Sequence, residues 1–189
     1  NDADLQKALT ESRKDSRRTG QFETVVKDYG FDLEDNEGNG NCFFYALADQ
    51  LSTRAATQPA LSRYAGYDHQ DLRALTVRGL GTRDDLLAFT GENPDELIGR
   101  MSEDRTWADD FAISTLARVL GITIVLINSD GNDPTIIEGG RDAVVYLGYE
   151  VGLHFQSARG VPSQALIERL EAKRSTSAAP ERIILPPSA

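Results

Sequence analysis

The sequence predicts an α+β fold in which a small, mostly antiparallel sheet packs between helices. Two patterns predict it: apolar residues recur at helical spacing up to residue 120, and from residue 122 to 157 they form short β-rich runs separated by tight turns. Helices followed by a run of strands are typical of the α+β class. The chain has 189 residues, 40% hydrophobic and 26% charged, which predicts one globular domain.

The first 30 residues divide into a polar part and an amphipathic part. Residues 1–21 are polar and are expected to form a solvated N-terminal arm, either helical or loose. The globular domain is expected to begin at residue 22, where apolar side chains start to recur three and four positions apart. Gly30 is a favourable end for that helix. Its buried face consists of Phe22, Val25, Val26 and Tyr29.

Four more helices are predicted before residue 121. One runs from Cys42, with Phe43, Ala46, Leu47 and Leu51 on its buried face. Another covers residues 72–80, and a third starts at Asn93-Pro94, where Asn is a cap and Pro suits the first turn. The strongest pattern predicts a helix over 106–120, with Thr106 as its cap, Asp109 at the capping-box position and Gly121 at its end.

The hydrophobic period changes after Gly121. Residues 122–127 form a β-branched run, and a turn at 130–134 follows it. Short strands are predicted over 135–138, 143–149 and 153–157, and the brief turns between them favour antiparallel neighbours. Residues 163–174 form a last predicted helix, which closes a domain of residues 22–174. Residues 175–189 are rich in Ser, Ala and Pro and are expected to be a disordered tail.

Composition excludes several functions. A net charge of −10 disfavours a nucleic-acid partner and favours a cationic one. One cysteine and two histidines cannot form an internal disulfide or a usual structural zinc site, so we expect no disulfide and no metal site. No stretch is apolar enough for a membrane span. We expect a monomer that acts in the reducing cytosol, delivered there as part of a longer protein because the chain begins at Asn1.

Cys42 is the candidate nucleophile. The turn-forming residues 35–41 lead directly into the helix that Cys42 begins, and a helix N-terminus favours a thiolate. The backbone amides of Asn39, Gly40, Asn41 and Cys42 are candidates for an oxyanion hole. A buried structural cysteine is the alternative. A P-loop is excluded because Asn41-Cys42 replaces the Lys-Ser/Thr pair, and a phosphatase loop because Ala48 replaces its Arg.

Two histidines are available as the base. His69 lies at a predicted helix start, where an exposed polar residue is ordinary. His154 lies on a short strand after a tight turn, with Leu153 and Phe155 pointing to the opposite face. A strand holds an imidazole in a fixed orientation, as general-base catalysis requires, so His154 is the better candidate. A plain surface histidine is the alternative at that position.

Four segments together resemble the ovarian tumour (OTU) family of deubiquitinases. Residues 39–47 are similar to its nucleophile motif, Asp-Gly-Asn-Cys-Leu-Phe-Arg-Ala, and residues 69–73 to its Leu-Arg helix. Trp107 with the helix and strand after it, and residues 153–158, are similar to its later blocks. The resemblance implies a papain-like OTU fold and hydrolysis after the C-terminal glycine of ubiquitin or polyubiquitin, without a cofactor. It implies Cys42 as the nucleophile and His154 as the base.

Two departures from the family pattern leave the site partly open. Asn39 stands where the family has Asp, and Gln156 where it has Asn or Asp as the third catalytic residue. Gln156 itself, a carboxylate from Asp32 or Asp35, or a dyad without a third member all satisfy the sequence. These departures leave open a non-catalytic ubiquitin-binding module, and a thiol protease acting on a ubiquitin-like modifier is a further alternative.

The family resemblance also implies where ubiquitin binds. Residues 82–110 carry an excess of acidic residues, which fits the channel that takes ubiquitin's arginine-containing tail. A solvated helical face explains the same charges equally well. Residues 60–105 correspond to the segment that contacts the body of ubiquitin in the family.

Overall fold

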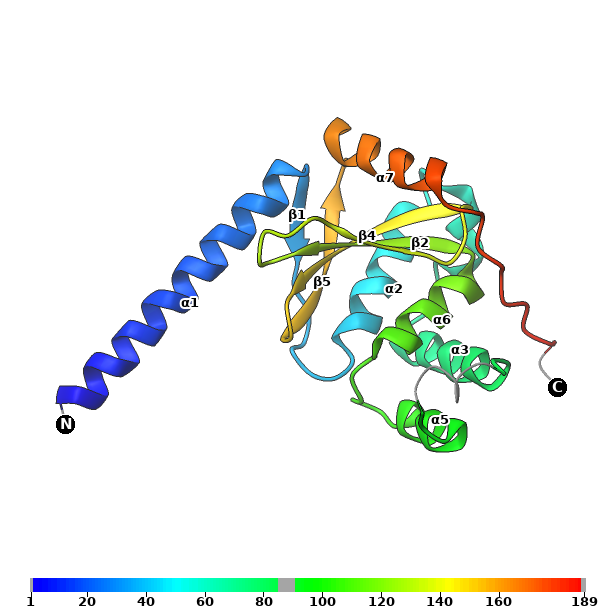
Figure 1. Cartoon of the computed structure of the whole chain (residues 1–189), viewed down its shortest axis with the longest axis horizontal. Helices are drawn as coiled ribbons and strands as arrows, with labels where there is room; N and C mark the ends of the chain where they lie inside the picture. Colours follow the sequence, from blue (N-terminus) through cyan, green and yellow to red (C-terminus); the bar gives the residue numbers. More distant parts are fainter. Residues whose placement is uncertain (1, 85–90, 188–189) are drawn as a thin grey trace.

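The computed structural model describes residues 2–84 and 91–187, with helices on both faces of one sheet (Figure 1). Asp68 caps α3 in a capping box with Asp71, and Asn93 caps α5 ahead of Pro94. Gly121, at φ 71°, ends α6 in the left-handed conformation that glycine adopts without cost. The helices of the described residues are α1 (Asp2–Asp28), α2 (Cys42–Arg54), the 3-10 helix η1 (Pro59–Tyr64), α3 (His69–Gly81), α5 (Pro94–Ser102), α6 (Asp110–Leu120) and α7 (Gln164–Thr176).

Five strands form one sheet in the order β1-β5-β4-β2-β3, antiparallel except between β2 and β4. β2 is buried along its whole length, as expected for its continuous apolar run. Register is fixed at the edge nearest the N-terminus, where Phe31 pairs with Gly160 and Glu34 with Ser157. The strands are β1 (Phe31–Glu34), β2 (Ile122–Asn128), β3 (Thr135–Glu138), β4 (Ala143–Glu150) and β5 (His154–Gly160).

Each face of the sheet has its own hydrophobic core. On one face α2, α3, α5 and α6 bury side chains against Ile124, Leu147 and Phe155. On the other face α1 and α7 bury Phe22, Val26, Leu166 and Leu170 against Val125, Tyr146 and Ala158. The predicted α+β class, with a small and mostly antiparallel sheet between helices, is confirmed.

Two local features differ from the sequence analysis. α6 begins at Asp110 and is capped by Asp109, whose carboxylate accepts from the Ala112 amide, so the predicted start and cap at Thr106 are wrong. Strand β1 was not predicted, because four residues with two carboxylates carry too little apolar signal. The predicted arm and the amphipathic stretch after it form the single helix α1, which projects from the domain (Figure 1).

The chain crosses the end of β2 between β3 and β4, so these consecutive strands are not neighbours. Gly139 and Gly140 make the crossing possible, because a Cβ at either would overlap the backbone at Ala117 or Gly121. The Gly139 amide donates to the Ile122 carbonyl and the Asp142 amide to the Gly121 carbonyl. β4 thereby reaches the far side of β2 and pairs with it in parallel, against the expectation of antiparallel neighbours.

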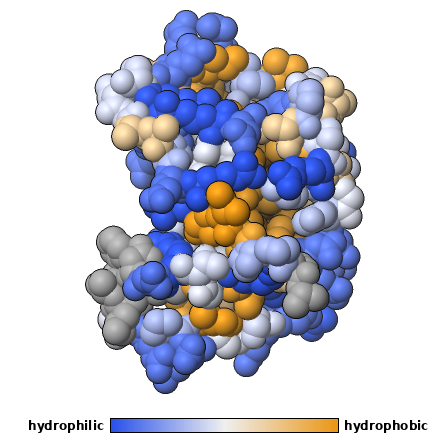
Figure 2. All heavy atoms as spheres, turned by 90° about the vertical axis from the view of Figure 1, so that its right-hand side faces the viewer, coloured by the Kyte–Doolittle hydropathy of each residue, from blue (hydrophilic) through white to orange (hydrophobic). Residues whose placement is uncertain are grey.

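One face of the molecule, seen in Figure 2, is mostly hydrophilic, with smaller hydrophobic patches among the polar residues. In the segment after α7, Arg182 pairs with Asp142 and Arg78 donates to the Pro186 carbonyl. Among the helices that the structure describes, none combines the length and hydrophobicity needed to cross a membrane.

Candidate active site

The loop before Cys42 is held tightly against the α5–α6 connection. Gly40 is buried there, and a Cβ at this position would overlap the Arg105 backbone, whereas a Cβ at Gly38 would meet open space. Arg105 itself has φ 64°, an uncommon conformation for a residue with a side chain. The glycine at position 40 is therefore required by this close approach, which fixes the path of the chain into α2.

Asn41 connects the same loop to Arg73 of α3. Its side-chain Oδ1 accepts from the Arg73 guanidinium at 2.5 Å and from the Arg105 amide at 3.1 Å. Arg73, only 6% exposed, also donates to the carbonyls of Met101 and Thr106. A guanidinium can satisfy several acceptors in fixed geometry, so Arg73 joins three segments around the nucleophile.

Cys42 is the first residue of α2 and is fully buried. Burial raises the pKa of its thiol above the ordinary value of 9.0, while the backbone amides of Phe155, Phe43 and Cys42 itself oppose that rise. The helix end therefore favours the thiolate as predicted, but desolvation is the larger effect. The Phe155 amide next to the sulfur also places the thiol beside the residue that follows His154.

His154 begins β5, and its imidazole is oriented by a carboxylate. Its Nε2 lies 2.9 Å from Asp35 Oδ1, and the imidazole side chain is 13% exposed. Its Nδ1 is buried and has no hydrogen-bond partner among the residues that the structure describes. With Nε2 committed to the carboxylate, Nδ1 is the nitrogen left to accept a proton.

Asp35 lies in the loop after β1 and accepts three hydrogen bonds at Oδ1. The donors are the Gln156 side chain at 2.8 Å, the Asn36 amide at 2.8 Å and His154. These bonds lower the pKa of Asp35 below its ordinary 3.8. The bond from Gln156 has the largest effect, and the bond from His154 lowers the pKa further. Gln156 thus binds the carboxylate and makes no hydrogen bond to the imidazole, and Asp32 pairs instead with Arg159 in the β1–β5 ladder.

Asn36 and Gln50 hold the nucleophile helix against the histidine strand. The Asn36 side-chain amide donates to the Phe155 carbonyl at 2.9 Å and to that of Cys42 at 3.5 Å. Gln50, fully buried on α2, donates to Ser157 Oγ and the Ala158 carbonyl, both at 2.8 Å. Neither residue has a local sequence signal, because every one of these partners except Cys42 is more than 100 positions away.

Of the four backbone amides predicted to form the oxyanion hole, two already donate hydrogen bonds within the protein and two do not. The Asn41 amide donates to Asn39 Oδ1 at 2.9 Å and the Cys42 amide to the Asn39 carbonyl at 3.1 Å. The amides of Asn39 and Gly40 have no partner within the described part of the chain, which leaves them able to bind an anion. Asn39 therefore organises the loop through both its side chain and its backbone.

The second histidine, His69, is not part of this hydrogen-bonded group. The His69 ring packs against the Tyr45 ring with centroids 4.3 Å apart and the planes tilted by 33°, and it makes no hydrogen bond with the residues around Cys42. Within residues 2–84 and 91–187, no group of three His, Cys, Asp or Glu side chains could hold a metal ion.

Sequence comparison identifies the family. The family model for "OTU-like cysteine protease" matches residues 37–152, more than half of the chain. The chain belongs to the OTU-like cysteine protease family. The matched segment of this OTU domain includes Cys42 and ends two residues before His154.

Known proteins similar to this OTU domain come from several sources. It is 25% identical over 142 residues to the RNA-directed RNA polymerase L of Crimean-Congo hemorrhagic fever virus, covering 72% of this chain and only 3% of the polymerase. The solved OTUD1 OTU domain matches with a TM-score of 0.59 at 14% identity over 75% of this chain and 94% of that one. A ubiquitin-bound OTU deubiquitinase from Wolbachia pipientis wMel matches with a TM-score of 0.53 at 17% identity, over 69% and 96%. The structural matches confirm the OTU fold.

Proposed function

We propose that this OTU domain is a deubiquitinase that hydrolyses isopeptide or peptide bonds after the C-terminal glycine of ubiquitin. The observation that carries the proposal is the single arrangement in which the Cys42 thiol lies at a helix start against the Phe155 amide and His154 is held by Asp35. Ubiquitin is the substrate expected from the family, and the similar Wolbachia enzyme is bound to ubiquitin. No cofactor takes part in this chemistry.

In this mechanism His154 activates the thiol at the moment of attack. The resting sulfur is protonated, because burial raises the pKa of the thiol. The proton passes from Cys42 to His154 Nδ1 as sulfur bonds to the substrate carbonyl carbon, and the oxyanion is stabilised by the amides of Asn39 and Gly40, which have no partner within the described part of the chain. Collapse breaks the C–N bond, and His154 gives its proton to the leaving amine. Water then attacks the thioester, returns a proton through His154 and releases Cys42.

Asp35 takes the role of third catalytic residue in this proposal. Its carboxylate binds Nε2 and stays ionised at neutral pH, so it holds the imidazole in the tautomer with a free Nδ1 and favours the imidazolium that forms. Gln156 supports it by donating to the same oxygen. The glutamine thus holds the carboxylate that orients the base, and the charge that it lacks is supplied by Asp35.

The ubiquitin tail is expected to reach Cys42 along a groove between α6 and β3. This groove, of about 590 Å³, is lined by Trp107, Phe111, Ile137 and Tyr149 and also by Phe155, whose amide faces the thiol. Trp107 is 43% exposed. Asp110 also lines the groove and is one of the carboxylates of the predicted acidic segment. Part of that predicted channel, residues 85–90, lies outside the described residues.

A ubiquitin probe with a C-terminal electrophile tests the proposal by intact mass. One adduct is expected on the full chain, none on Cys42→Ala and little on His154→Ala, whereas His69→Ala should react like the parent because His69 makes no hydrogen bond with the residues around Cys42. Binding without an adduct would instead support a non-catalytic ubiquitin-binding module. Faster labelling by a probe built on a ubiquitin-like modifier would identify the other thiol protease. The sole cysteine is the nucleophile, so the proposal includes action in a reducing compartment such as the cytosol.

A further inference from the structure

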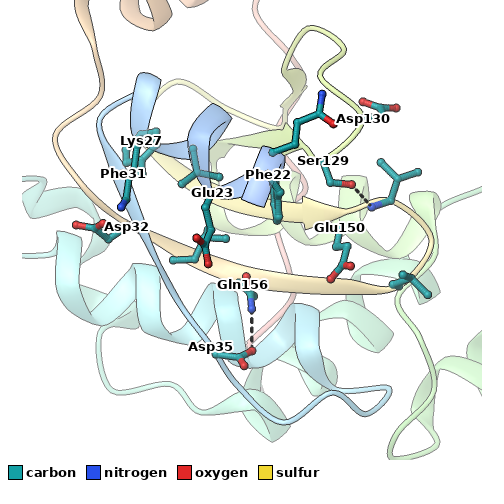
Figure 3. A pocket seen from close by; sticks show the side chains of 15 residues that line it. Phe22, Glu23, Lys27, Phe31, Asp32, Asp35, Ser129, Asp130, Glu150 and Gln156 are labelled. Atoms are coloured by element: carbon teal, nitrogen blue, oxygen red, sulfur yellow. Dashed lines mark hydrogen bonds between the residues drawn. The ribbon is translucent and has the colours of Figure 1, made fainter. Parts of the chain in front are cut away.

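A second groove opens on the α1 side of the sheet and reaches Asp35, the carboxylate that orients His154. It has a volume of about 850 Å³ and lies between the C-terminal half of α1, strand β1 and the β4–β5 hairpin (Figure 3). Asp35 and Gln156 form one of its ends, so it is continuous with the site that orients His154. The hairpin tip, residues 150–153, separates it from the groove that contains Trp107.

The charged side chains that line this groove are mostly negative. Five carboxylates line it and a single ammonium, that of Lys27, does so. Figure 3 shows the Glu23 and Glu150 side chains reaching toward the end where Gln156 holds Asp35, while Lys27 lies near Phe31. Neither Glu23 nor Glu150 forms an ion pair with a side chain that the structure describes. The five carboxylates are those of Glu23, Asp32, Asp35, Asp130 and Glu150.

Exposed apolar side chains accompany these charges. Val151 and Leu153 line the groove and are 46% and 57% exposed, two of the seven large hydrophobic residues that are exposed within residues 2–84 and 91–187. Such side chains at a concave polar surface are typical of a site for a peptide segment. The combination fits a segment with basic side chains and an apolar one, and it repels an acidic segment.

We propose that this groove binds the leaving-group chain, and that it selects basic residues next to the modified lysine. The inference rests on the proposed deubiquitinase function, which requires two chains to diverge from Cys42: the acyl chain and the chain that carries the lysine. The Trp107 groove takes the acyl chain, so the α1 groove is the path for the other. Glu23 and Glu150 pair with the basic side chains, and Val151 and Leu153 contact the apolar ones.

The test compares substrates that differ only in the leaving group. Ubiquitin is joined through its C-terminus to the central lysine of a short peptide with arginine neighbours, and to the same peptide with glutamate neighbours; ubiquitin on a small fluorescent amine is the reference. A few exposed ion pairs predict about threefold to tenfold higher kcat/KM for the arginine peptide. The preference should shrink as salt is raised, because salt screens exposed charges.

Variants of the full chain show whether the groove causes the preference. In the double variant Glu23→Gln, Glu150→Gln the ratio of the two rates should fall close to one, and Glu23→Lys with Glu150→Lys should invert it. Glu171→Gln, at an exposed glutamate of α7 away from the groove, should keep the ratio. Because the ratio is taken within one protein sample, a variant with less active material still gives a valid result.

The outcomes separate this inference from the proposed function. Cleavage of the reference and both peptides at equal rates would overturn the inference alone, as would a preference that survives in the double variant. Absence of turnover on all three substrates would overturn the proposed function and the inference together. A ratio that follows the charge of positions 23 and 150 establishes the groove as the leaving-group site.

Discussion

Gln50 offers the sharpest test of how the nucleophile helix is fixed to the sheet. Its Oε1 accepts from the Tyr146 amide at 2.8 Å and from Arg54 Nε at 2.5 Å, and its Nε2 donates to Ser157 and Ala158. In Gln50→Leu the Ala158 carbonyl keeps a bond from Arg54, and the Ser157 hydroxyl keeps Asp49. The Tyr146 amide and Arg54 Nε lose their partners.

The expected loss follows from these two orphaned donors. A buried unsatisfied donor costs about 1–3 kcal/mol, and a charged one is at the upper end, so Gln50→Leu should cost about 3–5 kcal/mol. For a chain of this size that corresponds to a drop in Tm of roughly 6–20 °C. Because Gln50 also joins α2 to β5, misplacement of Cys42 relative to His154 should lower kcat/KM about tenfold or more at a temperature where the variant is folded.

Gln58→Leu is the matched control. Gln58 also hydrogen-bonds β4, donating to the Val144 carbonyl at 2.7 Å and accepting from its amide at 2.8 Å, but it does not touch β5. It should cost about 1 kcal/mol and leave turnover near the parent value, because Val144 is only half-buried. Urea unfolding and hydrolysis of ubiquitin on a fluorescent amine measure both effects. The reasoning is refuted if Gln50→Leu unfolds at the parent urea concentration, or if both variants lose turnover equally.

Three further predictions concern the site itself. Gly40→Ala should destabilise the fold by about 1–3 kcal/mol and reduce probe labelling, because the added methyl group overlaps the Arg105 backbone. Gly38→Ala is the control and should change neither stability nor labelling. Equal effects of the two variants in urea unfolding would contradict this reasoning. Asp35→Asn should lower kcat/KM about tenfold to a thousandfold, less than the ~10⁴-fold of a buried triad aspartate, because Asp35 is 75% exposed. Since the pKa of Asp35 is depressed, its contribution to stability is complete above 3.8 and is lost as the pH falls through the lower folded value. The difference in urea midpoint between parent and Asp35→Asn should therefore be larger at pH 7 than at pH 2, and an unchanged difference would argue against stabilisation by the hydrogen bonds to this carboxylate. Alkylation of Cys42 by a small uncharged reagent should accelerate up to and beyond pH 9, because burial raises the pKa of the thiol; a rate plateau at neutral pH would show a resting thiolate.

The sequence determined the local elements well and their long-range partners poorly. The start of α2 at Cys42, the cap at Asn93 and the end of α6 at Gly121 follow from residues within one turn of each boundary, and the structure confirms all three. Strand β1 is different, since Phe31–Glu34 becomes a strand only through its pairing with β5, more than 120 positions later. The parallel contact between β2 and β4 likewise depends on a crossing that only the packing of Gly139 and Gly140 permits.

The same difference between local and long-range signals explains why the sequence did not show which residue orients His154. Gln156 has the expected spacing from His154, but alternation along β5 predicts only the face on which it lies, and its side chain binds Asp35 and not the imidazole. Asp35 precedes Cys42 by seven residues in a loop whose position depends on β1, the strand without a sequence signal. Once β1 pairs with β5, Asp35 comes to the end of the sheet where both His154 and Gln156 meet its Oδ1. A neutral residue after the histidine and a carboxylate before the cysteine are therefore complementary: the glutamine supplies the hydrogen bond that holds the carboxylate, and the carboxylate supplies the charge that the glutamine lacks.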